Sequence, residues 1–316
     1  MCLERMVSYK EILNTTQRSI LLGNGFSCSY NQRFNYNSIF DEMKSRASKK
    51  SIIEILGDSK THNIESIMKN LTDSGQKDDA EDIRDLFIKT LVDIHPENIL
   101  KVKKEKIDNC IYNMNEFTNV FTCNYDLLLY WVLVSEKNYN LSDGFIGKDV
   151  YYWRESYPNK VHFIHGALHL VNNEDNEFLK HSYSAKKGPL LYQVKQNLND
   201  NSFPLIVSEG TSYEKMRQID NNRYLKHSYD ALSKIEGTLF IYGFSMAEND
   251  NHIKDQIIKS NIESLVVGIY GDKDLDSNIK LMAEINDIKS RNKHIKNVVY
   301  FDASPVNMWS KCYKYD

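Results

Sequence analysis

The chain has 316 residues, of which 41% are hydrophobic, enough to bury a large core in one α/β domain or in a domain with an insertion. Its 40 basic and 43 acidic residues give a formal net charge of −3, so no overall field attracts nucleic acid or an anionic membrane. No apolar run approaches the roughly 20 residues that span a bilayer, and the start of the chain lacks the apolar core of a signal peptide. We therefore expect a cytoplasmic protein without nucleic-acid or membrane partners.

The first predicted strand covers residues 20–22 and ends in the segment Gly23-Asn24-Gly25-Phe26-Ser27. A Gly-x-Gly turn after a strand lets backbone N–H groups approach a pyrophosphate without a Cβ in the way. Alone, the turn is a weak signal, because any tight strand-to-helix turn favours glycine. In addition, Cys28 stands where the dehydrogenase fingerprint requires glycine or alanine. By itself the motif indicates only a plain turn.

Residues from about 36 to 115 read as helical, because their apolar residues recur at three- and four-residue steps. Breaks are expected at residues 73–76 and 95–97, where glycine or proline interrupts the pattern. No segment in this range reads as a strand. We interpret the range as a helical insertion between the first two strands of a sheet.

Strands and helices alternate regularly after residue 120. Strands are expected at residues 120–122, 161–165, 205–207, 239–242, 264–270 and 298–301. Helices are expected up to residue 134 and at residues 212–233, 249–260 and 274–289, with an irregular segment between residues 165 and 205. This alternation predicts βαβ units in a parallel sheet. The fold class is α/β, a Rossmann-like doubly wound parallel sheet with a helical insertion, in a single domain over residues 1–316.

Polar residues follow the second and third strands at the edge where parallel strands build a ligand crevice. Asn124 lies at the end of the second strand, and Asp126 precedes an apolar helix. Asp126 is therefore either a helix N-cap or a ligand contact, and the cap is the simpler role. His165 ends the third strand and is followed by Gly166, so its ring can offer a free edge to the crevice. A lone histidine at a strand end is more often a structural residue, which leaves both readings open.

Three histidines near this strand raise the question of a metal site. His162 and His165 point to opposite faces of a strand, and the turn at Gly166 directs His169 elsewhere. The three rings are therefore not expected to converge on a metal ion. We interpret His165 as the catalytic candidate and His169 as structural.

Five cysteines are spread along the chain with no Cys-x-x-Cys pair among them. An odd number at wide spacing is neither a disulfide framework nor a zinc knuckle. The sequence therefore predicts no bound zinc.

Two later segments complete a set of five motifs. Residues 204–210 form an apolar run that ends with Glu209 and a glycine, and residues 240–245 end with Gly243 and Ser245. In this order, over about residues 18–272, the motifs resemble those of the sirtuin-like family, whose members bind NAD and break its nicotinamide–ribose bond. The exact residues of these motifs, together with Asp143-Gly144-Phe145, are similar to those of a bacterial branch related to antiphage NAD hydrolases. Deacylase sirtuins carry a four-cysteine zinc module between the third and fourth motifs, whereas residues 171–202 contain no cysteine.

The resemblance implies that NAD binds as the substrate at the strand ends. His165 is the expected base, because imidazole accepts a proton near neutral pH. Asn124 is expected to orient water or the nicotinamide amide without adding a charge. The resemblance further implies contacts with NAD from Gly23, Asn24, Gly25, Phe26, Ser27, Asp126, Glu209, Gly243, Ser245 and Gly271. Among these, Phe26 is expected to close over the reactive ribose.

Without the zinc module, water becomes the default acceptor, so the predicted activity is NAD hydrolysis to nicotinamide and ADP-ribose. Two alternatives stay open: an NAD-dependent protein deacylase or ADP-ribosyltransferase, and a catalytically silent module that senses NAD or ADP-ribose. By family analogy the protein is an antiphage defence effector. Because unrestrained NAD hydrolysis would starve the host, we expect control by homo-oligomer assembly or by an activating protein partner.

Overall fold

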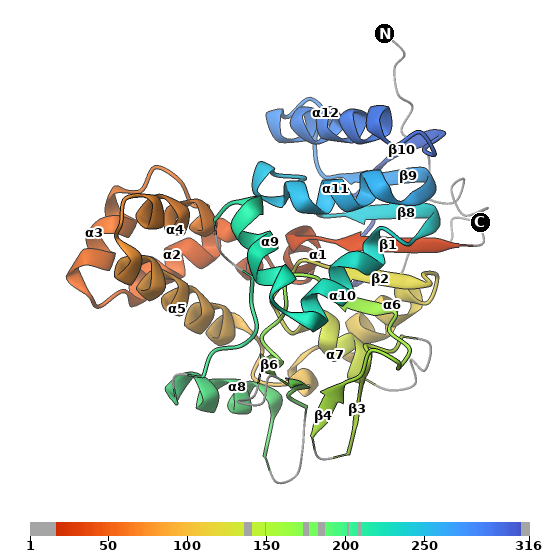
Figure 1. Ribbon diagram of the computed structural model, residues 1–316. Helices are drawn as coiled ribbons and strands as arrows, with labels where there is room; N and C mark the ends of the chain where they lie inside the picture. The colour runs from red at the N-terminus through yellow and green to blue at the C-terminus, as the bar shows by residue number, and fades with distance from the viewer. Residues whose placement is uncertain are drawn as a thin grey trace.

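Six parallel strands form the main sheet of the computed structural model, which describes residues 17–135, 141–148, 150–172, 177–182, 187–200, 202–207 and 210–310 (Figure 1). In order across the sheet they are β10 (Asn297–Asp302), β9 (Asn261–Ile269), β8 (Glu236–Tyr242), β1 (Arg18–Leu22), β2 (Asn119–Thr122) and β5 (Val161–Phe163). Each strand runs parallel to its neighbours. The α/β, Rossmann-like fold class predicted from the sequence is confirmed.

The strand order reverses between β1 and β8. β2 and β5 follow β1 outward on one side, and β8, β9 and β10 follow one another on the other side. The last residues of the two central strands, Leu22 and Tyr242, lie in register. In open parallel sheets, ligands bind at the carboxyl ends of the strands that flank such a reversal. Gly23 and Gly243, which directly follow these two strands, therefore mark the expected crevice.

The main-sheet strands are apolar because helices cover the sheet, and buried parallel strands read as continuous hydrophobic runs. In β1, Ile20, Leu21 and Leu22 are at most 2% exposed. The runs predicted as strands overlap these six strands, with one exception. The predicted strand at residues 205–207 is wrong, since the segment makes only an isolated antiparallel bridge between Gly166 and Ile206. It pairs with the turn that follows β5 instead of joining the sheet.

α1 (Asn24–Tyr30) directly follows β1; five more α-helices then follow one another before β2, and no strand interrupts residues 36–114. They are α2 (Tyr36–Arg46), α3 (Lys50–Asp58), α4 (Ile64–Asp73), α5 (Lys77–Ile94) and α6 (Lys104–Met114). Asn35 and Asn63 begin α2 and α4 by accepting backbone N–H bonds with their side chains. Figure 1 shows α2 to α5 as a group that stands beside the sheet, at the left of the view.

The remaining helices connect the later strands. They are α7 (Leu128–Val134), α8 (Leu190–Asn199), α9 (Ser212–Asp220), α10 (Arg223–Leu232), α11 (Asn251–Lys259) and α12 (Asp276–Arg291). The single helix predicted for residues 212–233 is two helices, because Asn222 caps a new helix by accepting the N–H of Leu225. Helices α10, α11 and α12 lie side by side over the sheet in Figure 1.

A second sheet, antiparallel and not predicted, is formed between residues 145 and 180. Its order is β3 (Phe145–Gly147), β4 (Tyr151–Trp153), β7 (Phe178–Lys180) and β6 (Leu170–Asn172). Each strand is three residues long, which is too short for an alternating pattern to be recognised.

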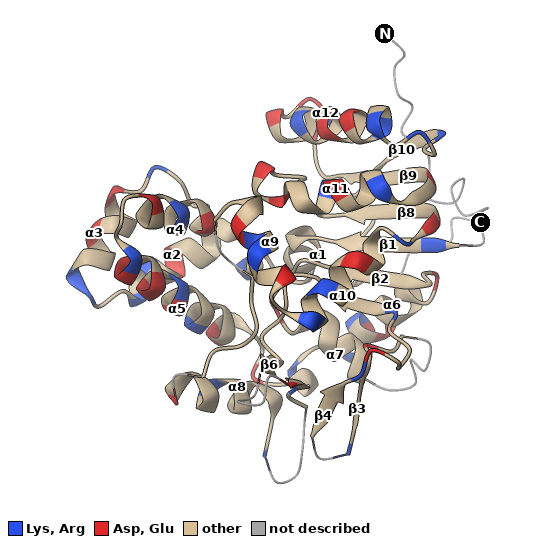
Figure 2. Cartoon of the chain, viewed as in Figure 1, with Lys and Arg blue, Asp and Glu red and all other residues tan. Residues whose placement is uncertain are grey.

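Charges of both signs are mixed over the molecule. Figure 2 shows basic and acidic residues interspersed along α5 and α12, while the strands of the main sheet carry few charges. Among the described residues, no helix is both long and apolar enough to cross a membrane.

Candidate functional site

Residues from four strand ends line one cavity of about 270 Å³, which we call pocket A. Its sheet side is formed by Gly23, Asn24, Cys123, Asn124, Tyr125, Asp126, His165, Gly243, Phe244 and Ser245. The helical segment after β1 contributes Phe34, Tyr36, Ile39, Glu65, Phe87 and Leu91. Lys215 and Asp250 complete the described lining. The predicted catalytic pair, Asn124 and His165, thus shares a cavity with parts of the first and last motifs.

A second cavity of about 550 Å³, pocket B, adjoins pocket A at Gly243, Phe244 and Ser245, which line both. Gly25 and the segment that follows it form one side of pocket B, and residues after β8, β9 and β10 form the rest. No charged side chain occurs among its described lining residues. Asparagine, serine and tyrosine side chains supply its polar groups, and Leu281 and Ala303 supply apolar surface.

The glycines of the first motif pack against the loop after β8. An added Cβ on Gly23 would lie 2.4 Å from the carbonyl oxygen of Gly243, and one on Gly25 would lie 2.5 Å from the Gly243 Cα. Gly243 has a φ of 65°, a left-handed conformation that favours glycine. The Gly25 N–H donates to the Gly243 carbonyl at 2.9 Å. The main structural role of these glycines is therefore to let the loop after β1 pack closely against the loop after β8 at the junction of the pockets.

We expect Gly25→Ala to destabilise the protein by about 1–3 kcal/mol and to weaken binding of NAD, the ligand expected from the sequence, because the new methyl group would push the Gly243 backbone away. The matched control is Gly57→Ala in α3, where an added Cβ meets nothing within 4 Å. That control should be neutral or slightly stabilising. Urea denaturation and calorimetric titration with NAD measure both effects. Equal behaviour of the two variants would show that the glycine contact is unimportant.

The side chain of Asn124 is held in place by two hydrogen bonds that its amide nitrogen donates. Its Nδ2 donates to the Gly23 carbonyl at 2.9 Å and to the Ser27 hydroxyl at 3.1 Å. Its Oδ1 accepts no hydrogen bond from any residue in the described part of the chain, so this oxygen is the amide atom left for a ligand. Asn124 thereby ties the first motif to the second.

Asp126 directly precedes Leu127, which is the N-cap residue of α7. Its Oδ1 accepts the Leu128 N–H at 2.9 Å at the start of α7, and its other oxygen accepts a short hydrogen bond from Ser27. It also lines pocket A. Burial raises the pKa of Asp126, although the Ser27 and Leu128 hydrogen bonds favour the carboxylate.

His165 is 2% exposed and faces a second histidine that the sequence did not suggest. Its Nε2 lies 2.8 Å from Nε2 of His252, and the His252 Nδ1 lies 3.1 Å from the Ser212 hydroxyl. Burial and the positive charge of Lys215 lower the pKa of His165 well below its usual value. Burial and His165 lower the pKa of His252 to about 2. Both rings are therefore neutral at physiological pH.

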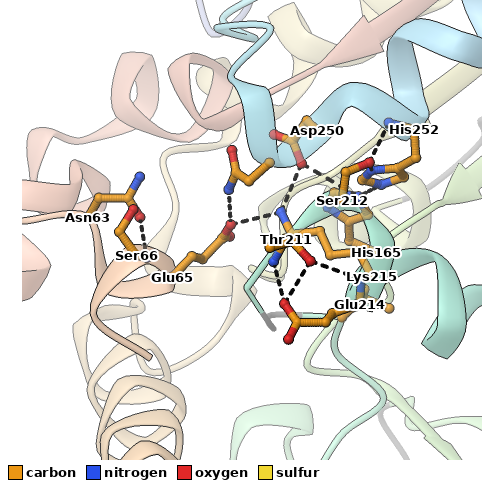
Figure 3. A network of polar contacts seen from close by, with 12 residues as sticks. Asn63, Glu65, Ser66, His165, Thr211, Ser212, Glu214, Lys215, Asp250 and His252 are labelled. Carbon is orange, nitrogen blue, oxygen red and sulfur yellow. Dashed lines mark hydrogen bonds and ion pairs between the residues drawn. The ribbon is translucent and has the colours of Figure 1, made fainter. Parts of the chain in front are cut away.

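A buried ammonium group connects the helical segment to the rest of the site (Figure 3). Lys215 Nζ contacts Glu65 Oε2 at 2.7 Å and Asp250 Oδ1 at 2.8 Å, and its side chain is 1% exposed. Burial acts to lower the pKa of Lys215, but the two carboxylates outweigh it and raise the pKa. Glu65 also contacts the Tyr125 hydroxyl at 3.0 Å. Because Glu65 belongs to α4, the helical segment supplies part of the charged wall of pocket A.

The sequence did not reveal Glu65, Lys215, Asp250 or His252 as site residues. Each lies in or beside a helix, with no motif around it. The capping box formed by Thr211 and Glu214 is a local signal that fixes the start of α9, and so places Lys215 one turn into that helix. The capping box predicts where the helix begins, but it does not predict that Lys215 contacts Glu65 and Asp250.

His165, Asp250 and His252 place three ligand atoms within 4.8 Å of one another. Two nitrogen ligands on a tetrahedral zinc, each at ~2.0–2.1 Å, would lie roughly 3.3 Å apart. The two Nε2 atoms are closer, at 2.8 Å, and the Asp250 oxygen already binds the Lys215 ammonium. The arrangement fits a hydrogen bond between rings better than a metal site.

We therefore expect the purified protein to hold less than one zinc per chain and to keep its melting temperature in the presence of a chelator. Elemental analysis and thermal melts with and without EDTA check this. One tightly held zinc per chain, lost together with activity, would contradict the hydrogen-bonded interpretation.

The other predicted site residues are dispersed. Phe26 is fully buried and packs on Trp309 with ring centroids 4.9 Å apart, so it lies in the core and lines neither pocket. Gly271 follows β9 and donates to the Ser304 hydroxyl, while its neighbour Tyr270 lines pocket B. Glu209 lies outside the described residues.

The two histidines that flank His165 belong to the core. The ring of His162 stacks on Phe121 at 4.7 Å, and the ring of His169 stacks on Tyr130 at 4.0 Å. Neither lines pocket A.

Comparison with known proteins gives a family and a distant structural match. A search of curated proteins finds no match. Among solved structures, a mutant Sir2 homologue in complex with ADP-ribose matches with a TM-score of 0.33 and 10% sequence identity, over 90% of this chain and 97% of that chain. The family model described as "Domain of unknown function (DUF4917)" matches residues 20–309. Since this match covers nearly the whole chain, the protein belongs to the DUF4917 family.

Proposed function

We propose that this protein hydrolyses NAD to nicotinamide and ADP-ribose. One observation carries the proposal: motif residues from four distant segments line a single pocket at the reversal of the strand order. These residues are Gly23, Asn24, Asn124, His165, Gly243 and Ser245. A parallel sheet places its nucleotide crevice at this point. The adjoining pockets A and B offer two chambers, as a dinucleotide with two different ends requires.

In this proposal, pocket A receives the nicotinamide and the ribose attached to it. Apolar side chains from the helical segment, such as Phe87 and Leu91, suit the ring. The pyridinium of NAD is cationic, and carboxylates of Glu65, Asp126 and Asp250 outnumber the Lys215 ammonium in the lining. Neutral His165 takes a proton from the attacking water, and the Asn124 oxygen orients that water. The adenosine half lies in pocket B.

Incubation of the purified protein with NAD, followed by chromatographic separation of the products, tests the proposal. Equal amounts of nicotinamide and ADP-ribose, formed without an added acceptor, support hydrolysis. Acyl-ADP-ribose formed only with an acylated peptide would identify a deacylase instead, and a labelled protein product would identify a transferase. Intact NAD bound with measurable affinity would identify a sensor.

We also propose, by analogy with sirtuin-like antiphage enzymes, that the activity serves phage defence in the cytoplasm and is restrained by self-assembly or by a protein partner. Cells that express the wild type or His165→Ala would be challenged with phage. Plaques would be counted, and the cellular concentration of NAD would be measured. Fewer plaques and depleted NAD with the wild type alone support the role. Equal plaque counts and unchanged NAD in both strains would exclude it.

A further inference from the structure

Three side chains form a hydrogen-bonded row that leads away from pocket A. His165 lines the pocket, His252 in α11 is 2% exposed, and Ser212 is a partly exposed residue that begins α9. The contacts are 2.8 Å between the two Nε2 atoms and 3.1 Å from His252 Nδ1 to the Ser212 hydroxyl (Figure 3). The row therefore runs from a buried ring to a side chain near the surface.

We infer that His165, His252 and Ser212 form a proton relay that carries the proton released by the attacking water from pocket A to solvent. The inference rests on the proposed NAD hydrolysis, because that reaction releases the proton. His252 and Ser212 do not touch the reacting atoms, so they are positioning and relay residues, and His165 remains the base.

The same heavy-atom positions accommodate two arrangements of protons. Before transfer, His165 donates through Nε2–H to His252 Nε2, and His252 donates through Nδ1–H to the Ser212 oxygen. After transfer, His165 carries its proton on Nδ1, His252 donates through Nε2–H to His165, and Ser212 donates its hydroxyl proton to His252 Nδ1. Each group exchanges one proton for another, no heavy atom moves, and one proton passes from water in the pocket to solvent beyond Ser212.

The surroundings favour this route over the nearest alternative acceptor. Asp250 Oδ1 lies 4.0 Å from His165 Nε2, which is beyond hydrogen-bond distance, and it already accepts from Lys215 at 2.8 Å. The Nδ1 of His165 forms no hydrogen bond with any residue that the structure describes, so it is the ring nitrogen left to accept a proton.

The relay also removes an electrostatic problem. If His165 kept the proton, an imidazolium would lie in a buried pocket beside the Lys215 ammonium, and both burial and that ammonium disfavour the charged ring. When His165 passes its Nε2 proton to His252 and His252 passes its Nδ1 proton to Ser212, both rings stay neutral. Ser212 is well placed as the exit, because it also accepts the His252 backbone N–H at 2.8 Å and so stays aligned with the ring.

Steady-state kinetics with His252→Ala and Ser212→Ala test the relay. We expect kcat for NAD to fall about 10-fold or more, with KM unchanged, which is less than the 10²–10⁴-fold loss for the base itself. Added imidazole should restore turnover to His252→Ala, in proportion to the basicity of a series of substituted imidazoles. The solvent deuterium isotope effect should report several moving protons in the wild type and fewer in Ser212→Ala. The exposed control His294→Gln should keep the wild-type kcat.

A second measurement does not depend on turnover. In protein labelled with ¹⁵N, the Nε2–H···Nε2 hydrogen bond should give a scalar coupling between the ring nitrogens of His165 and His252, and Ser212→Ala should change the tautomer of His252. Lack of that coupling, or a wild-type kcat in His252→Ala, would overturn the relay. Lack of NAD consumption by the wild type would instead overturn the proposed function, so the two failures are distinguishable.

Discussion

His165→Ala is expected to lower the rate of NAD hydrolysis by roughly 10²–10⁴-fold, the usual loss for a general base. NAD affinity should change little, because in the proposed mechanism the ring acts on water rather than on the bound dinucleotide. Asn124→Ala should lower the rate over the same range, since both groups act on one step. The double variant should be scarcely slower than the slower single variant.

The structure separates the two variants by their effect on folding. Asn124→Ala removes the donor to the Gly23 carbonyl and to the Ser27 hydroxyl, which should cost about 1–3 kcal/mol of unfolding free energy. Rates should therefore be measured where urea denaturation shows each protein to be folded. His294→Ala, on the surface, serves as the control. Wild-type turnover by His165→Ala, together with loss of activity in His169→Ala, would show that the base is misassigned.

Stability should fall steeply as the pH drops below 6.5. Burial lowers the pKa of seven described histidines, and five of these pKa values fall furthest: His95 to about 4, His162 to about 3, His252 to about 2, and both His165 and His169 well below their usual value. Below pH 6.5 the unfolded chain binds protons at these positions and the folded chain does not, so the unfolding free energy decreases as the pH falls. Each histidine should remove about 1 kcal/mol between pH 6.5 and 5.5, and together they should remove on the order of 5 kcal/mol. That is a large share of the stability of an ordinary domain.

His95 shows the cause and provides the test. Its Nδ1 is hydrogen-bonded to the Leu91 carbonyl, and its Nε2 accepts the Leu127 N–H at 3.0 Å, so a second ring proton would face a donor. Urea midpoints at pH 7.5, 6.5 and 5.5 would measure the loss for the wild type. His95→Gln should reduce the pH dependence by about 1 kcal/mol per pH unit. A wild-type midpoint that is constant from pH 7.5 to 5.5 would contradict the expectation.

The main sheet was predictable from the sequence because each of its strands contains an apolar run whose residues are buried or partly buried. The segment at residues 205–207 is equally apolar, yet it bridges the turn after β5. Its local composition cannot distinguish a strand buried within the main sheet from an extended segment buried against a turn. The small antiparallel sheet was missed because its strands have three residues each.

The candidate site was predictable only in part, for a related reason. Asn124 and His165 follow strands, and parallel strands end at one edge, so topology alone brings them together. Lys215 and Asp250 reach the pocket from helical segments whose placement depends on packing across the whole molecule. Glu65 depends additionally on how α4 stands beside the sheet (Figure 1). No pattern of spacing in the chain encodes those distances.

The position of β1 at the centre of the sheet has a consequence for synthesis on the ribosome. β1 is translated before the other strands of the main sheet, but its neighbour β8 begins only at Glu236, and the pair of histidines is complete only with His252. A nascent chain that stops in the helical segment or in the small sheet therefore has neither a closed sheet nor a finished pocket. Such contacts between distant parts of the chain also slow folding. If the protein hydrolyses NAD as proposed, copies that stop before His252 should consequently leave cellular NAD unchanged.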